Sequence, residues 1–421
     1  MFERLRQQVS PFLTARRWLI AYSGGLDSHV LLHLLASLRG QLDIPELLAV
    51  HVNHQLQPQA DGWQQHCADV CAGLDIPQAA HKVSVPAGAS VEQAARQQRY
   101  QVFESLLQPG DVLMMAHHAD DQAETLLYRL CRGAGVTGLA GMPASRALGQ
   151  GQLLRPLLAE TRQQLEAYAQ QHGLVWVDDP SNQDVSFDRN YLRQQVLPLL
   201  TARWPQAVKT LQRASSHLAQ TQHLLAELAA LDLAAAETGC DGEQWLNLGS
   251  ISALSPARQS NLLRHWLQDF SVVLSSYQQA QLEQQLQAQA DACPALVVGE
   301  FCLRRYRQRL YLTSARLPEP FRPFNWRTTS ACDVPGFGTL VVSRPVDIEL
   351  QVRPRSGGEL IQLAGEPHHR RLKTLLQTSA VPPWRRASLP LIYYQEQLLA
   401  VAPCWRCQAA DQLLPGVDFI F

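Results

Sequence analysis

Lysine is scarce in this sequence: only three lysines occur among its 421 residues, Lys82, Lys209 and Lys373. The most widespread phosphate-binding loop, G-x-x-x-x-G-K-[ST], needs a lysine directly after its glycines, and this pattern does not occur. The shortage therefore excludes a nucleotide-binding protein of that type. A nucleotide site in this chain has to hold phosphate groups with backbone amides, hydroxyls and arginines.

Long hydrophobic runs are also missing. No segment approaches the length of a membrane span, and we find no signal peptide. The nine cysteines lie at irregular spacings, which in that context favours reduced thiols. Cys404 and Cys407 have a C-x-x-C spacing, but the second pair that a zinc site requires is absent, and any role of the two stays open. We expect a cytoplasmic protein that does not enter a membrane.

A marked charge of either sign is absent as well. The chain has 36 Lys and Arg against 37 Asp and Glu, so any nucleic-acid-binding surface has to be local. Hydrophobic residues make up 46% of the chain, which is ample for packed cores. A length of 421 residues is long for one core and indicates two or three domains.

One stretch organises the first part of the chain: Ser23-Gly24-Gly25-Leu26-Asp27-Ser28. It follows the apolar run Trp18–Ile20 and precedes residues 29–35, which have helical apolar spacing. The order is therefore strand, glycine turn, helix. Two glycines expose consecutive backbone amides, and the start of a helix adds positive charge, so this turn suits a triphosphate. A plain connecting turn is the alternative for such a glycine pair.

Strands and helices alternate over residues 1–200. We expect strands at 18–21, 46–52, 80–85 and 111–116, with helices around 63–71 and at 91–107 between them. This rhythm predicts an α/β, doubly wound parallel sheet of the Rossmann-like kind, whose ligands lie at the carboxyl ends of the strands. Three polar segments follow predicted strands: Ser23–Ser28, His51–His54 and His117–Thr125. We therefore predict one shared site at that edge.

The segment His117–Thr125 supplies acidic side chains at the start of a helix. Asp120 and Asp121 in the first turn could serve only as helix caps. Alternatively, one of the two joins Asp27 in holding Mg²⁺, which prefers one or two carboxylates plus phosphate oxygens. His117 could contact substrate or phosphate, or be a structural histidine.

Two further polar segments complete the predicted site. Arg132 stands beside the glycine-rich run Gly133–Gly141, which suits a loop that closes on a polyanion, although the glycines could be no more than a helix stop. Residues 176–193 contain a polar cluster ending in Arg189 and Arg193, which exceeds what a helix cap at Asp188 requires.

The rest of the chain changes character. We predict a mainly helical middle domain at 207–317, with helices near 211–228, from Pro256 and at 278–290, and a strand pair at 301–312. Prolines at 318–323 form a linker, and a small α+β domain follows at 330–421. Between 351 and 390, seven Lys and Arg face two acids, which suits nucleic-acid backbone phosphates better than a plain solvated face; the seven are Arg353, Arg355, Arg370, Arg371, Lys373, Arg385 and Arg386. Trp384 could add a stacking platform.

Taken together, these motifs resemble the tRNA(Ile)-lysidine synthetases, a family of PP-loop ATP pyrophosphatases. The resemblance rests on separate stretches that span most of the chain and is weakest at 207–290: Ser23–Ser28, His51–His54, His117–Thr125, Arg132–Met142, Arg155–Leu158, Asp179–Arg193, Val352–Glu359, Lys373, Val381–Arg386 and Leu389–Ile392.

The resemblance implies a reaction, its substrates and a set of roles. ATP-Mg²⁺ would adenylate C2–O of the wobble cytidine in tRNA(Ile) with a CAU anticodon, and free L-lysine would then replace AMP to give lysidine. On this basis residues 1–206 form the PP-loop catalytic domain and residues 330–421 bind tRNA away from the anticodon. Expected nucleotide-binding residues are Ser23, Gly24, Gly25, Leu26, Asp27, Ser28, His51 and Asn53; expected catalytic residues are Asp27, His117, Asp121 and Arg132; and expected substrate-binding residues are Asp120, Glu124, Arg189, Arg193, Arg353, Arg355, Lys373, Arg385 and Arg386. Asp120 or Glu124 would receive the lysine ammonium.

Other readings remain at this stage. A PP-loop tRNA thiolase would need reactive paired cysteines near the ATP site, and Cys131 stands alone there. A small-molecule amide ligase would not need the basic tail, and a catalytically silent tRNA-binding protein would not need the intact Ser23–Ser28 stretch. The oligomeric state, with a homodimer as one alternative, and the rejection of the methionine tRNA with the same anticodon stay open.

Overall fold

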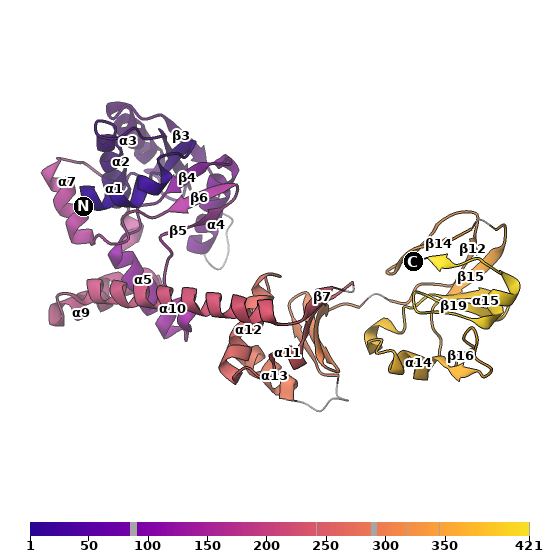
Figure 1. The fold of residues 1–421 in the computed structure, drawn as a ribbon. Coiled ribbons are helices and arrows are strands. Elements are labelled where there is room, and N and C mark those ends of the chain that lie inside the picture. Colours follow the sequence, from indigo (N-terminus) through magenta and orange to yellow (C-terminus); the bar gives the residue numbers. More distant parts are fainter. Residues whose placement is uncertain (85–90, 241, 288–292, 318, 345, 421) are drawn as a thin grey trace. The chain divides into compact units, whose positions relative to one another are not determined.

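The computed structural model describes residues 1–84, 91–240, 242–287, 293–317, 319–344 and 346–420 (Figure 1). The chain forms two compact units, Met1–Leu225 and Ala226–Phe421, and each is described here by itself. Within the described residues, no helix is both long and apolar enough to cross a membrane.

The first unit is built on a six-stranded sheet of order β3-β2-β1-β4-β6-β5. The pairs β3–β2, β2–β1, β1–β4 and β4–β6 are parallel, and only β5 runs antiparallel to its neighbour β6. The doubly wound parallel sheet predicted from the sequence is thus confirmed, with one antiparallel strand at its edge. The strands are β1 (Arg17–Ala21), β2 (Glu46–Asn53), β3 (Gln78–Lys82), β4 (Asp111–Met114), β5 (Ser145–Leu148) and β6 (Gly151–Leu154).

Helices cover both faces of this sheet because its central strands are apolar on both sides. Trp18 and Ile20 of β1 belong to one buried cluster, whereas Leu19 between them belongs to another, as the two-residue alternation of a strand requires. The first cluster includes residues of α2, α3 and α7, and the second includes Phe103 of α4. The helices are α1 (Phe2–Val9), α2 (Leu26–Leu38), α3 (Ala60–Gly73), α4 (Val91–Leu106), α5 (Ala119–Cys131), α6 (Val136–Leu139), α7 (Arg162–Gln171), α8 (Asp188–Tyr191), α9 (Leu197–Arg203) and α10 (Ala207–Ala235).

The predicted elements of this unit agree with the structure apart from their ends. The third strand begins two residues earlier than expected and ends at Lys82, and the end predicted at residue 85 lies outside the described residues. The helix that a cap at Asp188 would start is not a single α-helix: α8 is followed by a π-helical turn at Leu192–Val196 and then by α9. The π-helical turn carries Arg193, and such turns are often found at functional sites.

The second unit contains two sheet-based regions with separate cores. The first region pairs a five-stranded antiparallel sheet with helices α11 (Leu248–Ile251), α12 (Pro256–Gln268) and α13 (Ser276–Gln287). The sequence predicted α12, α13 and the pair β10–β11, and the structure adds α11 and three strands. The strands are β7 (Thr238–Cys240), β8 (Gln244–Asn247), β9 (Ala295–Val298), β10 (Phe301–Tyr306) and β11 (Arg309–Ser314). The end of α13 predicted at residue 290 lies outside the described residues.

The last region is an α+β fold rich in short strands, as predicted. It has a five-stranded sheet of order β12-β15-β18-β19-β20, a three-stranded sheet β13-β14-β21 and the pair β16–β17. Its elements are β12 (Phe324–Arg327), β13 (Cys332–Val334), β14 (Gly338–Val342), β15 (Glu349–Arg353), β16 (Leu360–Ile361), β17 (Arg370–Arg371), α14 (Leu372–Thr378), β18 (Leu391–Tyr394), β19 (Gln397–Val401), β20 (Trp405–Arg406), α15 (Gln408–Leu413) and β21 (Phe419–Ile420). Because the two regions share one compact unit, the predicted boundaries at 206, 317 and 330 stay predictions.

Candidate functional site

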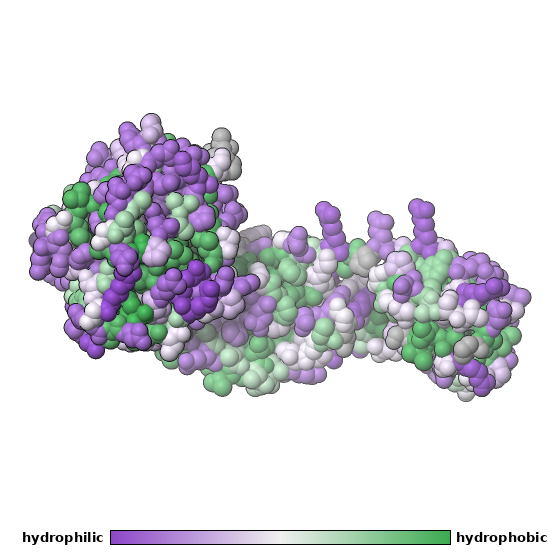
Figure 2. All heavy atoms as spheres, turned by 90° about the horizontal axis from the view of Figure 1, so that it is seen from above, coloured by the Kyte–Doolittle hydropathy of each residue, from purple (hydrophilic) through white to green (hydrophobic). Residues whose placement is uncertain are grey.

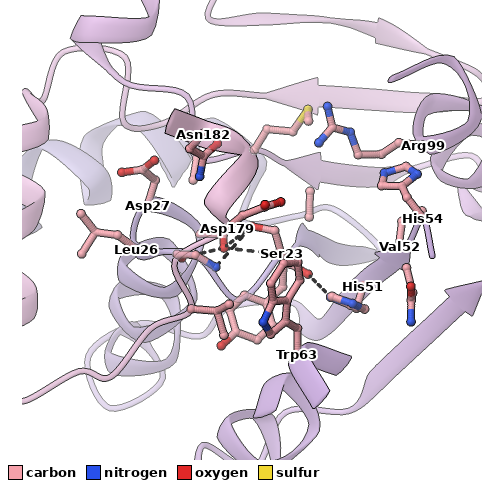
Figure 3. A pocket seen from close by; sticks show the side chains of 18 of the residues that line it. Ser23, Leu26, Asp27, His51, Val52, His54, Trp63, Arg99, Asp179 and Asn182 are labelled. Atoms are coloured by element: carbon pink, nitrogen blue, oxygen red, sulfur yellow. Dashed lines mark hydrogen bonds between the residues drawn. The ribbon is translucent and has the colours of Figure 1, made fainter. Parts of the chain in front are cut away.

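A cavity of about 430 Å³ opens at the carboxyl ends of the central strands of the first unit. The Ser23–Ser28 turn lines it after β1, His51 and Asn53 line it at the end of β2, and His117 lines it after β4. Figure 3 shows Asp27 on one side of this cavity and His54 and Arg99 on the other. The shared site predicted from the three polar segments is therefore a single cavity.

The turn that lines the cavity is held by its own hydroxyls. The Ser28 hydroxyl donates to the Gly25 carbonyl (3.0 Å) and accepts from the backbone N–H of Ser23 (3.2 Å), and the Ser23 and Ser28 hydroxyls lie 3.1 Å apart. Helix α2 begins at Leu26, so its first-turn amides have no acceptor within the helix. A turn of this kind, with free amides and two hydroxyls, suits phosphate oxygens.

Gly24 is the one position in this turn where a side chain cannot be accommodated. Its φ is +87°, and a Cβ there would lie 2.8 Å from the Sγ of Cys67 on α3. Gly25 is different, since its φ is −74° and a Cβ would lie 3.6 Å from the nearest atom, the Ser23 hydroxyl. Gly24 therefore shapes the turn, but it is not one of the residues that line the cavity.

His51 and Asn53 at the end of β2 are buried polar residues with fixed orientations. The ring N–H at Nδ1 of His51 donates to the Tyr22 carbonyl (3.0 Å), and burial lowers the pKa of this histidine, so the ring is neutral. The Asn53 amide donates to Asp61 (3.0 Å) and Gln64 (3.1 Å). Both residues therefore have fixed orientations beside the Ser23–Ser28 turn, which we call the phosphate turn.

His118 is the centre of a carboxylate cluster, and the sequence analysis did not select it. Its Nε2 lies 3.5 Å from a carboxylate oxygen of Asp27 and 3.5 Å from one of Asp121, while its side chain is fully buried. Burial acts to lower its pKa, but the charge of Asp121 and hydrogen bonds with Asp120 and Asp27 raise it to about 10. His118 therefore lies among three carboxylates that favour its protonated form. Its position directly between His117 and the acids was the signal available in the sequence.

Asp121 both caps α5 and lines the cavity. Its carboxylate accepts from the His118 backbone N–H (3.0 Å), which is the capping role weighed for it, and another of its oxygens accepts from Arg193 (3.0 Å). Arg162, a second residue that sequence reasoning missed, lies 3.4 Å from Asp27. Asp121 therefore serves as a helix cap and also faces the cavity, and its role as a metal ligand stays a prediction.

The pair Asp27 and Asp121 fits Mg²⁺. Their carboxylates face the same imidazole nitrogen, which occupies the kind of position a cation takes between two carboxylates. Two carboxylates leave room for the phosphate oxygens and waters with which Mg²⁺ completes its octahedron. In the described part of the chain no three His, Cys, Asp or Glu side chains are arranged to hold a metal, so nucleotide oxygens would have to supply further ligands.

Besides Gly24, four predicted residues of the first unit lie outside the cavity lining. Glu124 is buried and held by Arg193 through two hydrogen bonds (2.6 and 3.1 Å), and Asp120 accepts from the Arg162 backbone N–H (2.8 Å). Arg132 is exposed and stacks on Tyr128. Arg189 is half-buried. Arg193 and His117 do line the cavity, and burial and nearby arginines lower the pKa of His117 to about 3.

Four of the seven tail cations form ion pairs inside the second unit, one of them being Arg370 with Glu366 (2.9 Å). Arg353 contacts Glu396 (3.0 Å), Arg355 contacts Glu359 (3.3 Å) and Arg385 contacts Glu243 (2.8 Å). Arg386 donates to the Tyr306 hydroxyl (3.0 Å). Lys373 is exposed. The tail charge is thus less available than its sequence count indicates.

Trp384 packs inside the second unit. Its indole N–H donates to Glu243 at 3.0 Å, and its ring packs edge-on against Tyr311. A stacking platform for RNA, as the sequence indicated, needs an open ring face, whereas the guanidinium of Arg304 lies over this one.

Comparison with known proteins gives consistent matches along the chain. Family models match at residues 1–200 (PP-loop domain), 246–311 (TilS substrate binding domain) and 350–415 (TilS substrate C-terminal domain). The tRNA(Ile)-lysidine synthases of Pseudomonas fluorescens and Pseudomonas aeruginosa are each 47% identical over 99% of this chain and 93% of their own length. That of Coxiella burnetii is 38% identical over 97% of this chain and 93% of its length.

Proposed function

The chain belongs to the tRNA(Ile)-lysidine synthase family, and from this premise we propose that its first-unit cavity activates a tRNA cytidine with ATP and then ligates free lysine to it. The observation that carries the proposal is 47% identity with relatives of that name over 99% of the chain, joined to a phosphate turn that lines the cavity. Family membership also decides against the thiolase alternative. The protein is a ligase that uses ATP through its PP-loop domain.

The reaction has two displacements. The C2 oxygen of the wobble cytidine attacks the α-phosphorus of ATP, the bond to the bridging oxygen breaks, and pyrophosphate leaves. The ε-amine of lysine then attacks C2, the C2–O bond breaks, AMP leaves, and the amine gives up a proton to solvent. Both steps depend on positioning and on neutralising phosphate charge, which the arrangement of fixed donors around the cavity supports.

We assign the binding of ATP to the turn Ser23–Ser28 with His51 and Asn53. The amides at the start of α2 and the two serine hydroxyls would hold the departing pyrophosphate. Neutral His51 and buried Asn53 would contact the nucleoside end. Support comes from their common position on one cavity wall. Arg132 as a phosphate ligand would require its glycine-flanked loop to move, and this role stays a prediction.

Asp27 and Asp121 would hold Mg²⁺ when nucleotide is bound. The ion would supply charge neutralisation at the phosphates. Arg162, Arg193 and His118 hold these two carboxylates in place in the structure described here. Neutral His117 beside them accepts from Arg155 at Nδ1, so it would donate its Nε2–H to the substrate.

Lysine is the proposed amine substrate, and its ammonium group needs a carboxylate. Asp120 and Glu124 remain our candidates. Lysine could bind Glu124 only if Arg193 released it, because Arg193 donates to both of its carboxylate oxygens. The basic tail would bind tRNA(Ile) away from the anticodon, chiefly through exposed cations such as Arg371 and Lys373, because Arg353, Arg355 and Arg385 already form ion pairs. A cytoplasmic location follows from a tRNA substrate, and a homodimer remains one alternative for the assembly.

One experiment tests the function directly. The purified protein is incubated with ATP, Mg²⁺, radiolabelled lysine and total tRNA, and the labelled RNA is isolated and sequenced. We expect label only in the isoleucine tRNA with a CAU anticodon, together with release of AMP and pyrophosphate in equal amounts. Label in no RNA, or pyrophosphate release that does not depend on tRNA, would contradict the proposal.

A further inference from the structure

An arginine cluster adjoins the cavity of the first unit through the lining residues Met115 and His117. Its centre is Tyr100 on α4, which has the guanidinium carbon of Arg96 5.1 Å and that of Arg146 5.5 Å from its ring centroid. The Tyr100 hydroxyl contacts Met115 (3.6 Å), which lines the cavity. Arg155, 4% exposed, donates to His117, another lining residue. We call Arg96, Tyr100, Arg146 and Arg155 the Tyr100 cluster.

The Tyr100 cluster carries positive charge that the protein does not neutralise. Among the described residues, no carboxylate lies within ion-pair distance of Arg96, Arg146 or Arg155, whereas most predicted tail arginines have one. Three arginines surround the phenol closely enough to lower its pKa despite burial. Crowded like charges cost free energy in the empty protein, and cation–π contacts with one ring recover little of it. An anionic ligand would remove this cost.

The ligand has to differ from the triphosphate, because the cavity already has a phosphate turn at Ser23–Ser28. The proposed reaction brings a second polyanion to the same cavity: an RNA strand whose target base is turned out of its stack. When one base enters the cavity, the phosphates on either side of it remain at the rim. Arg146 is exposed and Arg96 half-buried, so both can reach such phosphates.

We propose that Arg96 and Arg146 bind the backbone phosphates that flank the target base. Both guanidinium groups lie over the Tyr100 ring, and buried Arg155 connects the cluster to the cavity by donating to His117. This inference rests on the proposed function, since it takes RNA as the substrate. The proposed phosphate contacts lie on the first unit, beside the cavity, and are separate from the basic stretch at 351–390 that the sequence analysis selected for tRNA binding.

The test is the double variant R96A/R146A, compared with R6A/R203A, which removes two exposed arginines elsewhere on the same unit. Binding of tRNA is measured between 50 and 300 mM salt, and ATP-Mg²⁺ binding by calorimetry. We expect R96A/R146A to bind tRNA about tenfold more weakly and to lower the slope of log K against log salt by about 1.4, the value for two single-strand phosphate contacts. ATP affinity and the control variant should stay unchanged.

Several outcomes would overturn the proposal. A salt slope equal to that of the control variant would show that the Tyr100 cluster is a solvated surface without an RNA contact. A loss confined to ATP or pyrophosphate binding would show that the cluster binds the triphosphate instead. If the double variant does not fold, R146A alone decides, because Arg146 is exposed and its removal leaves no buried gap. Failure of the wild-type protein to label tRNA with lysine would refute the proposed function, while the salt slope would still report on RNA binding.

Discussion

Asp27 carries a negative charge that two cationic side chains from different elements approach. His118 lies 3.5 Å and Arg162 3.4 Å from its carboxylate. Both cations neutralise Asp27 without a hydrogen bond of ideal length, which leaves the carboxylate available to a stronger cation. At the scale of single residues, the charge of Asp27 is balanced by contacts that are longer than an ideal hydrogen bond.

We expect D27N to abolish ligation while sparing RNA binding. The amide keeps the size of the side chain but cannot neutralise a metal ion, so lysine incorporation should fall by about 100-fold or more. The measurement is labelled lysine in tRNA, with tRNA affinity determined in parallel. D43N, at an exposed aspartate, is the matched control. Turnover within a few-fold of wild type would remove Asp27 from the site.

Gly24 offers a test of the phosphate turn that does not change charge. In G24A the backbone at φ +87° costs about 1–2 kcal/mol, and the new methyl group clashes with Cys67. We expect a lower melting temperature and weak ATP binding, both measured on the purified variant. G24A/C67A removes the clash and should recover part of the stability.

G25A is the companion control for this turn, because its backbone and surroundings accept a methyl group. It should fold as stably as wild type. Equal destabilisation by G24A and G25A would show that the turn is not shaped in the way the structure indicates.

Residue spacing predicted the phosphate turn but not its partners. Ser23–Ser28 is contiguous, so its identity as a strand–turn–helix could be inferred from neighbouring residues. Arg162 reaches Asp27 from 135 positions away, and only the packing of α7 against α2 brings the two together. Glu124 had the right type for a substrate ligand, yet its direction on α5 turns it toward Arg193. Sequence patterns give a residue's type and rarely its direction.

At the scale of elements, Arg193 joins the π-helical turn that carries it to the first turns of α5. Arg193 bridges Asp121 and Glu124, whose side chain is 2% exposed. Burial raises the pKa of Glu124 even though Arg193 acts to lower it. A carboxyl with a raised folded-state pKa stabilises the fold only below that pKa, and the contribution is lost as pH rises through it.

R193A should therefore cost more stability at high pH than at low pH. Without the guanidinium, Glu124 is a buried and unpaired charge once ionised, a loss of about 3 kcal/mol at pH 8. At pH 5 the carboxyl takes up a proton and the loss should be smaller. Chemical denaturation of R193A and wild type at both pH values measures the difference.

The rescue variant R193A/E124Q isolates the charge. A neutral amide at position 124 needs no counter-ion, so the double variant should be more stable than R193A at pH 8 and should show little pH dependence. An equal loss for R193A at pH 5 and pH 8 would mean that Arg193 acts through packing alone.

Elements with an apolar run or helical spacing were predictable from the sequence, and elements without such a pattern were not. The strands β1, β2 and β4 and the helices after them follow from apolar runs and helical spacing. β7 and β8 have three and four residues, and each becomes a strand only by pairing with β11 or its neighbour. Such segments take their conformation from the sheet they join, which local pattern cannot reveal.

At the scale of the whole molecule, charge counted along the tail overstated the surface available to RNA. Seven cations and two acids occur between 351 and 390, but Arg353 and Arg385 pair with Glu396 and Glu243, acids outside that window. A count along the chain does not include partners that the fold brings from elsewhere. Arg371 and Lys373 are exposed, and they are the tail cations best placed for phosphate contacts.

The final prediction separates phosphate contact from structure in the tail. R371A/K373A should lower the salt slope of tRNA binding by about 1.4 and leave stability unchanged, because exposed cations release counterions when they meet phosphates. R385A should leave the slope nearly intact, since Arg385 and the Trp384 indole are joined to the region around β8 through Glu243. E243Q provides the decisive comparison. If Arg385 has a structural role, E243Q reproduces the increased protease sensitivity that we expect for R385A. If Arg385 instead binds phosphate, E243Q frees its charge, and tRNA binding becomes stronger and steeper in salt, which would refute the structural role.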